Sequence, residues 1–177
     1  MDLAPLFVVA GAPGAGKTTV RPHLVRLAHG PVVMEMDEIL EDGTLLGVPI
    51  ADPAAAPVWP AYDRLWSRIV RMVRRAGHPV VLLAPAPSPE ALSDGSASED
   101  LDGRVHWSLL DCAEPARRER LRARGWSTEA IDDAVAEVAR VRPLLSTVFD
   151  NDAATPEECA ARILTWVRGH TGDGRLD

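Results

Sequence analysis

The sequence predicts a three-layer α/β fold in which helices cover both faces of a parallel sheet of five strands. Short apolar runs alternate along the chain with longer amphipathic segments, which is typical of parallel strands joined by right-handed crossovers. The runs are continuously apolar, which indicates a sheet that is buried on both faces. Because the chain has 177 residues, we expect residues 1–177 to form one domain.

The predicted strands are these short apolar runs. All but the last are rich in Val, Leu and other residues that favour strands. In chain order we expect them at Leu6–Ala10, Pro31–Met36, His78–Ala84, Val105–Leu110 and Ser146–Asp150, of which the last is the weakest.

The predicted helices lie between the strands and show apolar residues at helical spacing. Pro22 falls inside the first helix, where a slight kink is expected, and Gly77 is expected to stop the second. Thr155 and Glu158 form a capping box that starts the last helix, with Pro156 in its first turn. The four helices before it are expected at Lys17–His29, Tyr62–Ala76, Ala113–Arg124 and Ser127–Arg140.

Three segments are expected to be irregular. Gly43–Trp59 is rich in Pro, Ala and Gly, Pro85–Gly103 is rich in Pro, Ser and Asp, and the chain after Gly169 is a polar tail. The first two follow the ends of regular elements, where open α/β sheets place their ligand loops.

The segment that follows the first strand matches G-x-x-x-x-G-K-[ST] at every fixed position. Its glycines let successive N–H groups turn toward phosphate oxygens, and the next helix adds its positive N-terminal end. Lys17 is expected to reach the β- and γ-phosphates, and the Thr18 hydroxyl to bind Mg²⁺. The residues expected to bind nucleotide here are Gly11, Ala12, Pro13, Gly14, Ala15, Gly16, Lys17, Thr18 and Thr19.

A carboxylate follows the second strand at Asp37. The carboxyl end of a strand faces the ligand in such sheets, so Asp37 can order Mg²⁺ or accept a proton from an acceptor hydroxyl. Alternatively, Asp37 only caps a short helix at Glu38–Leu40. Glu35, two residues earlier on the same face, is a second candidate.

Five arginines lie on the predicted helix 113–124. Arg120 and Arg124 are four residues apart and share a face, from which they can stabilise the charge on a transferred phosphoryl group. The alternative is that these arginines only form a solvent-exposed face of the helix. Arg140 and Arg142, after the next helix, are further candidates. The remaining arginines of the predicted helix 113–124 are expected at the surface, and these are Arg117, Arg118 and Arg122.

Aromatic residues open the helix before the third strand. They can line an acceptor pocket, or they can belong to the core and its rim. The residues that open this helix, both aromatic and charged, are Trp59, Tyr62, Asp63, Arg64 and Trp66.

Composition and motifs exclude several classes of function. Acids outnumber bases 26 to 19, which disfavours a nucleic-acid partner. No run approaches the ~20 apolar residues of a membrane helix, and no basic segment precedes the first apolar run as in a secretory signal, so a cytoplasmic protein is expected. Cys112 and Cys159 lack metal-ligand spacing and are expected to be reduced structural thiols. The histidines form no triad, and no G-x-S-x-G elbow is present.

Four stretches together resemble the small P-loop kinases that phosphorylate metabolites, nucleotides or antibiotics, such as shikimate, gluconate and nucleoside monophosphate kinases and chloramphenicol phosphotransferase. These stretches are GAPGAGKTT (Gly11–Thr19), MEMDE (Met34–Glu38), ERLRARG (Glu119–Gly125) and FDNDAATPEECAARIL (Phe149–Leu164). The resemblance implies a P-loop NTPase fold with a small helical lid at about residues 120–142 and acceptor-site segments at about 40–66 and 85–103. It implies ATP, with GTP possible, and Mg²⁺.

The resemblance also implies roles for single residues. Asp37 would be the acceptor-side base or the Mg²⁺ organiser, Arg120 and Arg124 would belong to the lid, and Asn151–Ala153 would border the adenine. The chain departs from many relatives because its third strand ends in Ala84-Pro85, without an aspartate.

The expected function is therefore ATP-dependent transfer of a phosphoryl group to a hydroxyl of a small molecule, by a monomer or a homodimer. The alternative is a nucleotide-binding switch or a catalytically weak binding protein, which the missing aspartate favours. A GTPase is disfavoured because the sequence has no N-K-x-D motif.

Overall fold

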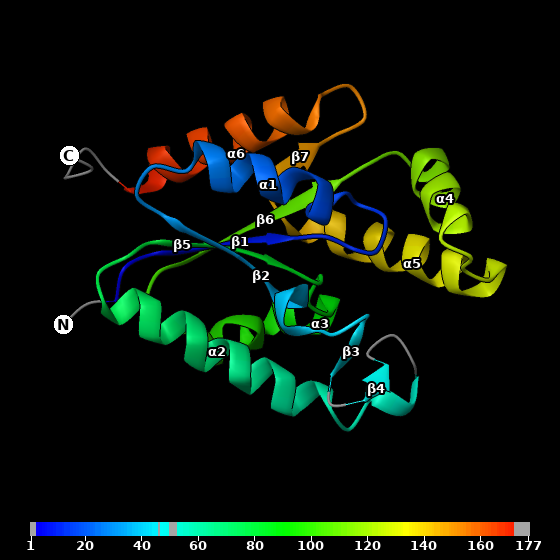
Figure 1. The fold of residues 1–177 in the computed structure, drawn as a ribbon, viewed down its shortest axis with the longest axis horizontal. Coiled ribbons are helices and arrows are strands. Elements are labelled where there is room, and N and C mark those ends of the chain that lie inside the picture. Colours follow the sequence, from blue (N-terminus) through cyan, green and yellow to red (C-terminus); the bar gives the residue numbers. More distant parts are fainter. Residues whose placement is uncertain (1–2, 46, 50–52, 172–177) are drawn as a thin grey trace.

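A parallel sheet of five strands forms the middle layer of the protein (Figure 1). The computed structural model describes residues 3–45, 47–49 and 53–171. The strand order is β2-β5-β1-β6-β7, and every neighbouring pair is parallel. The strands are β1 (Leu6–Ala10), β2 (Val32–Glu35), β5 (Val80–Ala84), β6 (Val105–Asp111) and β7 (Val148–Asp150). All five predicted strands are confirmed, with small shifts at their ends.

Helices cover both faces of this sheet (Figure 1). On one face, α1 (Lys17–Leu27) and α6 (Pro156–Thr171) pack against alternate strand residues such as Phe7 and Val9. On the other face, α2 (Trp59–Arg75) packs against Leu6, Val8 and the neighbouring strands. The three-layer prediction is therefore confirmed, and the physical reason is the alternation of side chains between the two faces of each strand.

Two further helices project at one end of the sheet, where the helical lid is predicted (Figure 1). They are α4 (Glu114–Ala123) and α5 (Thr128–Val141), which contact each other and are followed by a short turn of helix, η4 (Arg142–Leu144). Buried apolar residues such as Leu121 and Ile131 hold the pair together.

The helix ends follow the predicted signals. The backbone N–H of Thr155 donates to Glu158 Oε2 at 2.8 Å and that of Glu158 donates to Thr155 Oγ1 at 3.2 Å, which confirms the capping box of α6. Gly77 takes a positive φ of 90° just after Ala76, the C-cap of α2. Helix α1 continues through Pro22. Helix α2 begins before the predicted Tyr62, because proline is tolerated in a first helical turn and Pro60 stands there.

The two internal segments predicted as irregular contain short regular elements. The first holds a small hairpin, β3 (Thr44–Leu45) and β4 (Val48–Pro49), and a short helix, η2 (Pro53–Ala55). The second holds α3 (Pro89–Asp94), which Ser88 caps, and η3 (Ser96–Leu101). Residues 46 and 50–52 of the first segment and the part of the polar tail after Thr171 lie outside the described residues.

Buried Arg74 fixes the end of η3 against the rest of the domain. Its guanidinium donates to the carbonyl oxygens of Ala4 at 2.6 Å and Asp102 at 2.7 Å, and also to that of Leu101. The segment between β5 and β6 is therefore anchored at its C-terminal end by side-chain hydrogen bonds.

The expectation for the two cysteines is also met. Cys112 and Cys159 are buried free thiols. Among the helices of the described residues, none is both long enough and apolar enough to cross a membrane.

Candidate active site

The loop between β1 and α1 has the backbone of a phosphate cradle. Gly14 and Gly16 adopt positive φ values of 80° and 97°, a region that L side chains rarely occupy. A Cβ at Gly16 would lie 2.8 Å from Asn151 Nδ2, so neighbouring groups also require glycine there. The loop enters the N-terminus of α1, whose free N–H groups and dipole favour an anion.

Lys17 lies among carboxylates at the base of this loop. Its ammonium donates to the carbonyl oxygen of Gly11. Burial lowers the pKa of Lys17, while the negative charges of Asp37, Glu35 and Glu137 act in the opposite direction. Glu137, which comes from α5, was not a candidate from the sequence. The ammonium is thus placed beside the loop, close to the end of β2.

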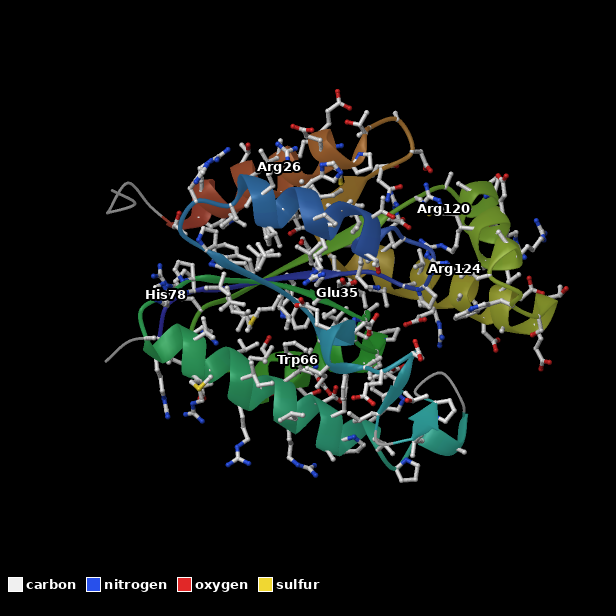
Figure 2. All side chains as sticks on the ribbon, in the orientation of Figure 1. Arg26, Glu35, Trp66, His78, Arg120 and Arg124 are labelled. Carbon is white, nitrogen blue, oxygen red and sulfur yellow. The ribbon has the colours of Figure 1, made fainter. Side chains whose placement is uncertain are left out.

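Thr18 and Glu35 form the oxygen-rich part of the site. Thr18 Oγ1 donates to Glu35 Oε1 at 3.0 Å, and Glu35 is only 3% exposed. Burial raises the pKa of the Glu35 carboxyl. Figure 2 shows Glu35 between α1 and the short helix after β2. A hydroxyl and a poorly solvated carboxylate fit Mg²⁺, which prefers oxygen ligands and takes one or two carboxylates together with phosphate oxygens.

The metal pair expected from the sequence was Thr18 with Asp37, but the hydrogen bond joins Thr18 to Glu35. Among the described residues, no group of three or more His, Cys, Asp or Glu side chains is arranged to hold a metal. A cation at this place therefore depends on the phosphate oxygens of a nucleotide for its remaining ligands.

Asp37 lies on η1 (Met36–Ile39) and is exposed. The alternative in which Asp37 caps a helix at Glu38–Leu40 is wrong, because Glu35 is the N-cap and its backbone N–H donates to Glu38 Oε2 at 2.9 Å. The carboxylate of Asp37 therefore has no capping role, and its charge acts on Lys17.

Arg120 reaches the phosphate loop from α4. Its Nη1 donates to the carbonyl oxygen of Gly14 at 3.1 Å and to Asn151 Oδ1 at 3.5 Å. Asn151 in turn donates to the carbonyl oxygen of Ala15. Figure 2 labels Arg120 and Arg124; Arg120 lies on α4, and Arg124 is the residue that caps its C-terminal end. The structure thus brings Arg120 and Asn151 together on the outer side of the loop.

Arg124 is exposed and lines a pocket together with Arg120 and Asn151. This pocket has a volume of about 440 Å³. It opens beside the phosphate loop, on the side toward the start of α6. The residues that line it are Gly16, Thr19, Val20, Arg120, Ala123, Arg124, Asn151, Ala154 and Pro156.

The prediction that Arg117 lies at the surface is wrong. Arg117 is 1% exposed, and its guanidinium bonds to Asp111 Oδ1 at 2.5 Å and to the carbonyl oxygen of Pro13 at 2.7 Å. One sequence signal points to this outcome, because Arg117 precedes the buried Leu121 by four residues and therefore shares its helix face.

Asp111 connects this arginine to a second one. Its other carboxylate oxygen pairs with Arg142 of η4, so Arg142 contributes to the support of the loop. Arg140 is exposed at the end of α5. The surface prediction holds for Arg122, which is exposed, and for Arg118, which pairs with Glu114 and Asp132 at the surface.

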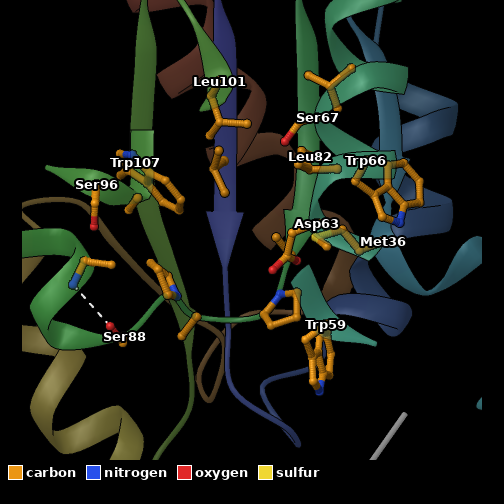
Figure 3. Close-up of a pocket in the computed structure, with 18 residues that line it drawn as sticks. Met36, Trp59, Asp63, Trp66, Ser67, Leu82, Ser88, Ser96, Leu101 and Trp107 are labelled. Atoms are coloured by element: carbon orange, nitrogen blue, oxygen red, sulfur yellow. Dashed lines mark hydrogen bonds between the residues drawn. The ribbon is translucent and has the colours of Figure 1, made fainter. Parts of the chain in front are cut away.

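A larger pocket of about 520 Å³ lies between α2, the segment after β5, and the sheet (Figure 3). Of the five residues named from the sequence, Trp59, Asp63 and Trp66 line this pocket. Tyr62 is a core residue, 1% exposed, and Arg64 lies in a separate surface depression with Arg68 and Arg71. No sequence signal pointed to Trp107, which also lines the pocket from β6.

The large pocket is continuous with the end of the sheet that carries the phosphate loop. Ala84 and Pro85 line the pocket, and the carbonyl oxygen of Ala84 accepts from the N–H of Gly11 at 3.1 Å. Met36 lines it as well, and is followed by Asp37. Tyr62 donates to the carbonyl oxygen of Met36 and so fixes this turn against α2.

The chain matches no protein-family model, and no curated protein matches it with significant similarity. Solved structures do match it over almost the whole chain. Shikimate kinase from Acinetobacter baumannii, in complex with shikimate, has a TM-score of 0.65 at 16% identity, with 94% of each chain covered. The tunicamycin resistance protein of Deinococcus radiodurans has a TM-score of 0.62 at 22% identity, covering 93% of this chain and 95% of that chain. A gluconokinase from Sinorhizobium meliloti has a TM-score of 0.57 at 17% identity, covering 96% and 97%. The protein therefore has the fold of the small-molecule P-loop kinases, as the resemblance in its sequence implies.

Proposed function

We propose that the protein is a kinase that transfers the γ-phosphoryl group of ATP, with GTP as a possible substitute, to a hydroxyl of a small molecule. One observation carries this proposal. The phosphate loop with Lys17, the carboxylates at the end of β2 and a pocket of about 520 Å³ meet at one edge of the sheet. A donor site and an acceptor site that adjoin in this way fit direct transfer between two bound substrates.

The loop binds the phosphates in this proposal. Backbone N–H groups of Gly14–Thr19 and the ammonium of Lys17 bind the phosphate oxygens, and Thr18 with Glu35 holds Mg²⁺. When bound, Mg²⁺-ATP supplies the reactive phosphoryl group and neutralises its developing charge. Its adenine lies in the pocket bordered by Asn151 and Arg124.

Asp37 acts on the acceptor. It accepts the proton of the acceptor hydroxyl while that oxygen bonds to the γ-phosphorus and the bond from phosphorus to the β–γ bridging oxygen breaks. Arg120 and Arg124 stabilise the charge that spreads over the phosphoryl oxygens. We place Asp37 in this role because it is exposed beside Lys17 and has no capping function. We further propose that the protein works in the cytoplasm as a monomer or homodimer.

The test is a coupled assay of ADP formation with Mg²⁺-ATP over a panel of hydroxyl compounds. For an acceptor that stimulates ADP release, Asp37→Asn is expected to lower kcat by about a hundredfold or more, while nucleotide binding stays unchanged. The matched control is Asp42→Asn, an exposed acid in the next loop whose positive φ of 49° asparagine tolerates. Equal activity of Asp37→Asn and the control would remove Asp37 from the mechanism.

A second candidate function is nucleotide binding without turnover. It is favoured by the end of β5, where Ala84 and Pro85 stand without a carboxylate. In that case Mg²⁺-ATP raises the melting temperature and Lys17→Ala abolishes this effect, but no acceptor stimulates ADP release.

A further inference from the structure

The large pocket offers very little positive charge to an acceptor. Its lining comes from Met36, from α2 between Trp59 and Val70, from the segment after β5 and from the sheet beneath them. In the sequence, the two predicted acceptor-site segments, 40–66 and 85–103, contain nine acids and a single cation, Arg64. Arg64 lies in the separate depression with Arg68 and Arg71. Among the described residues that line the pocket, none is Lys, Arg or His.

This charge pattern disfavours anionic acceptors. A carboxylate or phosphate buried in the pocket would lose its hydration without gaining a cationic partner, and such a transfer is unfavourable. It would also meet the negative charge of Asp63, which is the charged side chain among the described lining residues.

Asp63 presents its carboxyl group to the pocket (Figure 3). Within the described part of the chain it has neither a hydrogen-bond partner nor an ion-pair partner, although its neighbours in the pocket wall are mostly apolar. Asp63 is exposed at the mouth of this wall, and partial loss of hydration among its apolar neighbours raises the pKa of its carboxyl. A donor group on a ligand would supply the partner that the protein does not provide.

Three tryptophans form the walls of the same pocket (Figure 3). Trp107 is held by its Nε1, which donates to Ser98 Oγ at 2.9 Å, and Trp59 packs edge-to-face on Tyr62 with a centroid distance of 5.7 Å. Trp66 is 4% exposed. Aromatic walls that are fixed before binding favour a flat apolar ligand, because large contact areas form with little loss of side-chain freedom.

We propose that the acceptor is a non-anionic alcohol with an aromatic or similarly flat apolar body and a hydrogen-bond donor that bonds to Asp63. The donor is an ammonium, a hydroxyl or an amide N–H. As an acceptor assignment, this rests on the proposed kinase function. The ligand class follows from the pocket lining alone, so binding tests it separately from turnover.

The test uses three small probes that share one phenyl carbinol body and differ in a single group. Phenylethanolamine carries an ammonium, phenylglycol a hydroxyl and mandelate a carboxylate. Titration calorimetry without nucleotide is expected to show that the first two bind at least about tenfold more tightly than mandelate, a difference of about 1.4 kcal/mol. In Asp63→Asn, phenylethanolamine is expected to lose about tenfold in affinity and phenylglycol less. The control Arg64→Gln, at the next position of α2, is expected to change none of the three.

Several outcomes overturn the assignment: mandelate binding as tightly as phenylglycol, no binding of any probe, or unchanged affinities in Asp63→Asn. Efficient phosphorylation of shikimate, gluconate or a nucleoside monophosphate would also overturn it, while leaving the kinase function intact. Conversely, the probes can bind in the expected order of affinities while no non-anionic aromatic alcohol is phosphorylated. That result would support the pocket assignment and contradict the kinase function.

Discussion

Replacing Arg117 tests whether the buried network behind the phosphate loop stabilises the protein. Arg117→Met keeps much of the side-chain volume but removes the donors to Asp111 and to the Pro13 carbonyl. Removal of one partner of a buried ion pair costs about 3–5 kcal/mol. Asp111 retains Arg142 as a partner, so we expect the lower limit, about 3 kcal/mol. The lost hydrogen bond to the carbonyl adds about 1 kcal/mol.

These terms convert into a measurable change in thermal stability. For a chain of this size, each kcal/mol lowers the melting temperature by about 2–4 °C. Arg117→Met is therefore expected to melt about 8–16 °C below the unmodified protein, followed by circular dichroism. Urea unfolding should show the same loss as a lower midpoint with an unchanged slope. The stabilisation by Mg²⁺-ATP is expected to weaken too, because Arg117 holds the loop at Pro13.

Arg118→Met is the matched control, since Arg118 lies one residue further on α4 but pairs with Glu114 and Asp132 at the surface. Exposed pairs of this kind contribute little. If both variants melt at the same temperature, the reasoning from burial is refuted. A double variant with Asp111→Asn provides a second check, because strictly additive losses would mean that the two side chains are not coupled.

Three further predictions concern the nucleotide site. Gly16→Ala is expected to abolish the rise in melting temperature with Mg²⁺-ATP, because φ is 97° and the new Cβ would lie 2.8 Å from Asn151 Nδ2; a normal rise would contradict the cradle. Asn151→Ala is expected to weaken ATP binding in calorimetry, because the donor to the Ala15 carbonyl is lost, whereas unchanged affinity would remove Asn151 from the site. Glu35→Gln is expected to raise the melting temperature of the nucleotide-free protein near neutral pH. Burial raises the pKa of the Glu35 carboxyl in the folded protein. The carboxyl therefore contributes fully to stability at pH values below the usual pKa range of glutamate, and this contribution is lost as the pH rises through the raised pKa. The gain in Glu35→Gln should therefore shrink as the pH falls, and a gain that is constant with pH would contradict the assignment.

The sequence predicts the fold closely where the signal is local. Strands such as Leu6–Ala10 and Val80–Ala84 are continuous apolar runs, and burial on both faces requires that pattern. The capping box at Thr155 and the stop at Gly77 depend on a few neighbouring residues only. The segment that contains α3 was missed because its Pro and Ser residues serve both turns and first helical turns.

The candidate site divides in the same way. The phosphate loop is one continuous segment whose chemistry is contained in its own residues, so the sequence by itself determines the cradle, Lys17 and Thr18. The choice of Glu35 as the partner of Thr18, the burial of Arg117 against Asp111, and the meeting of Trp59, Asp63 and Trp107 around one pocket were decided by the tertiary structure. Each depends on how α2, α4 and the sheet pack together, and the distances between side chains far apart in the chain are set by that packing and by no local pattern.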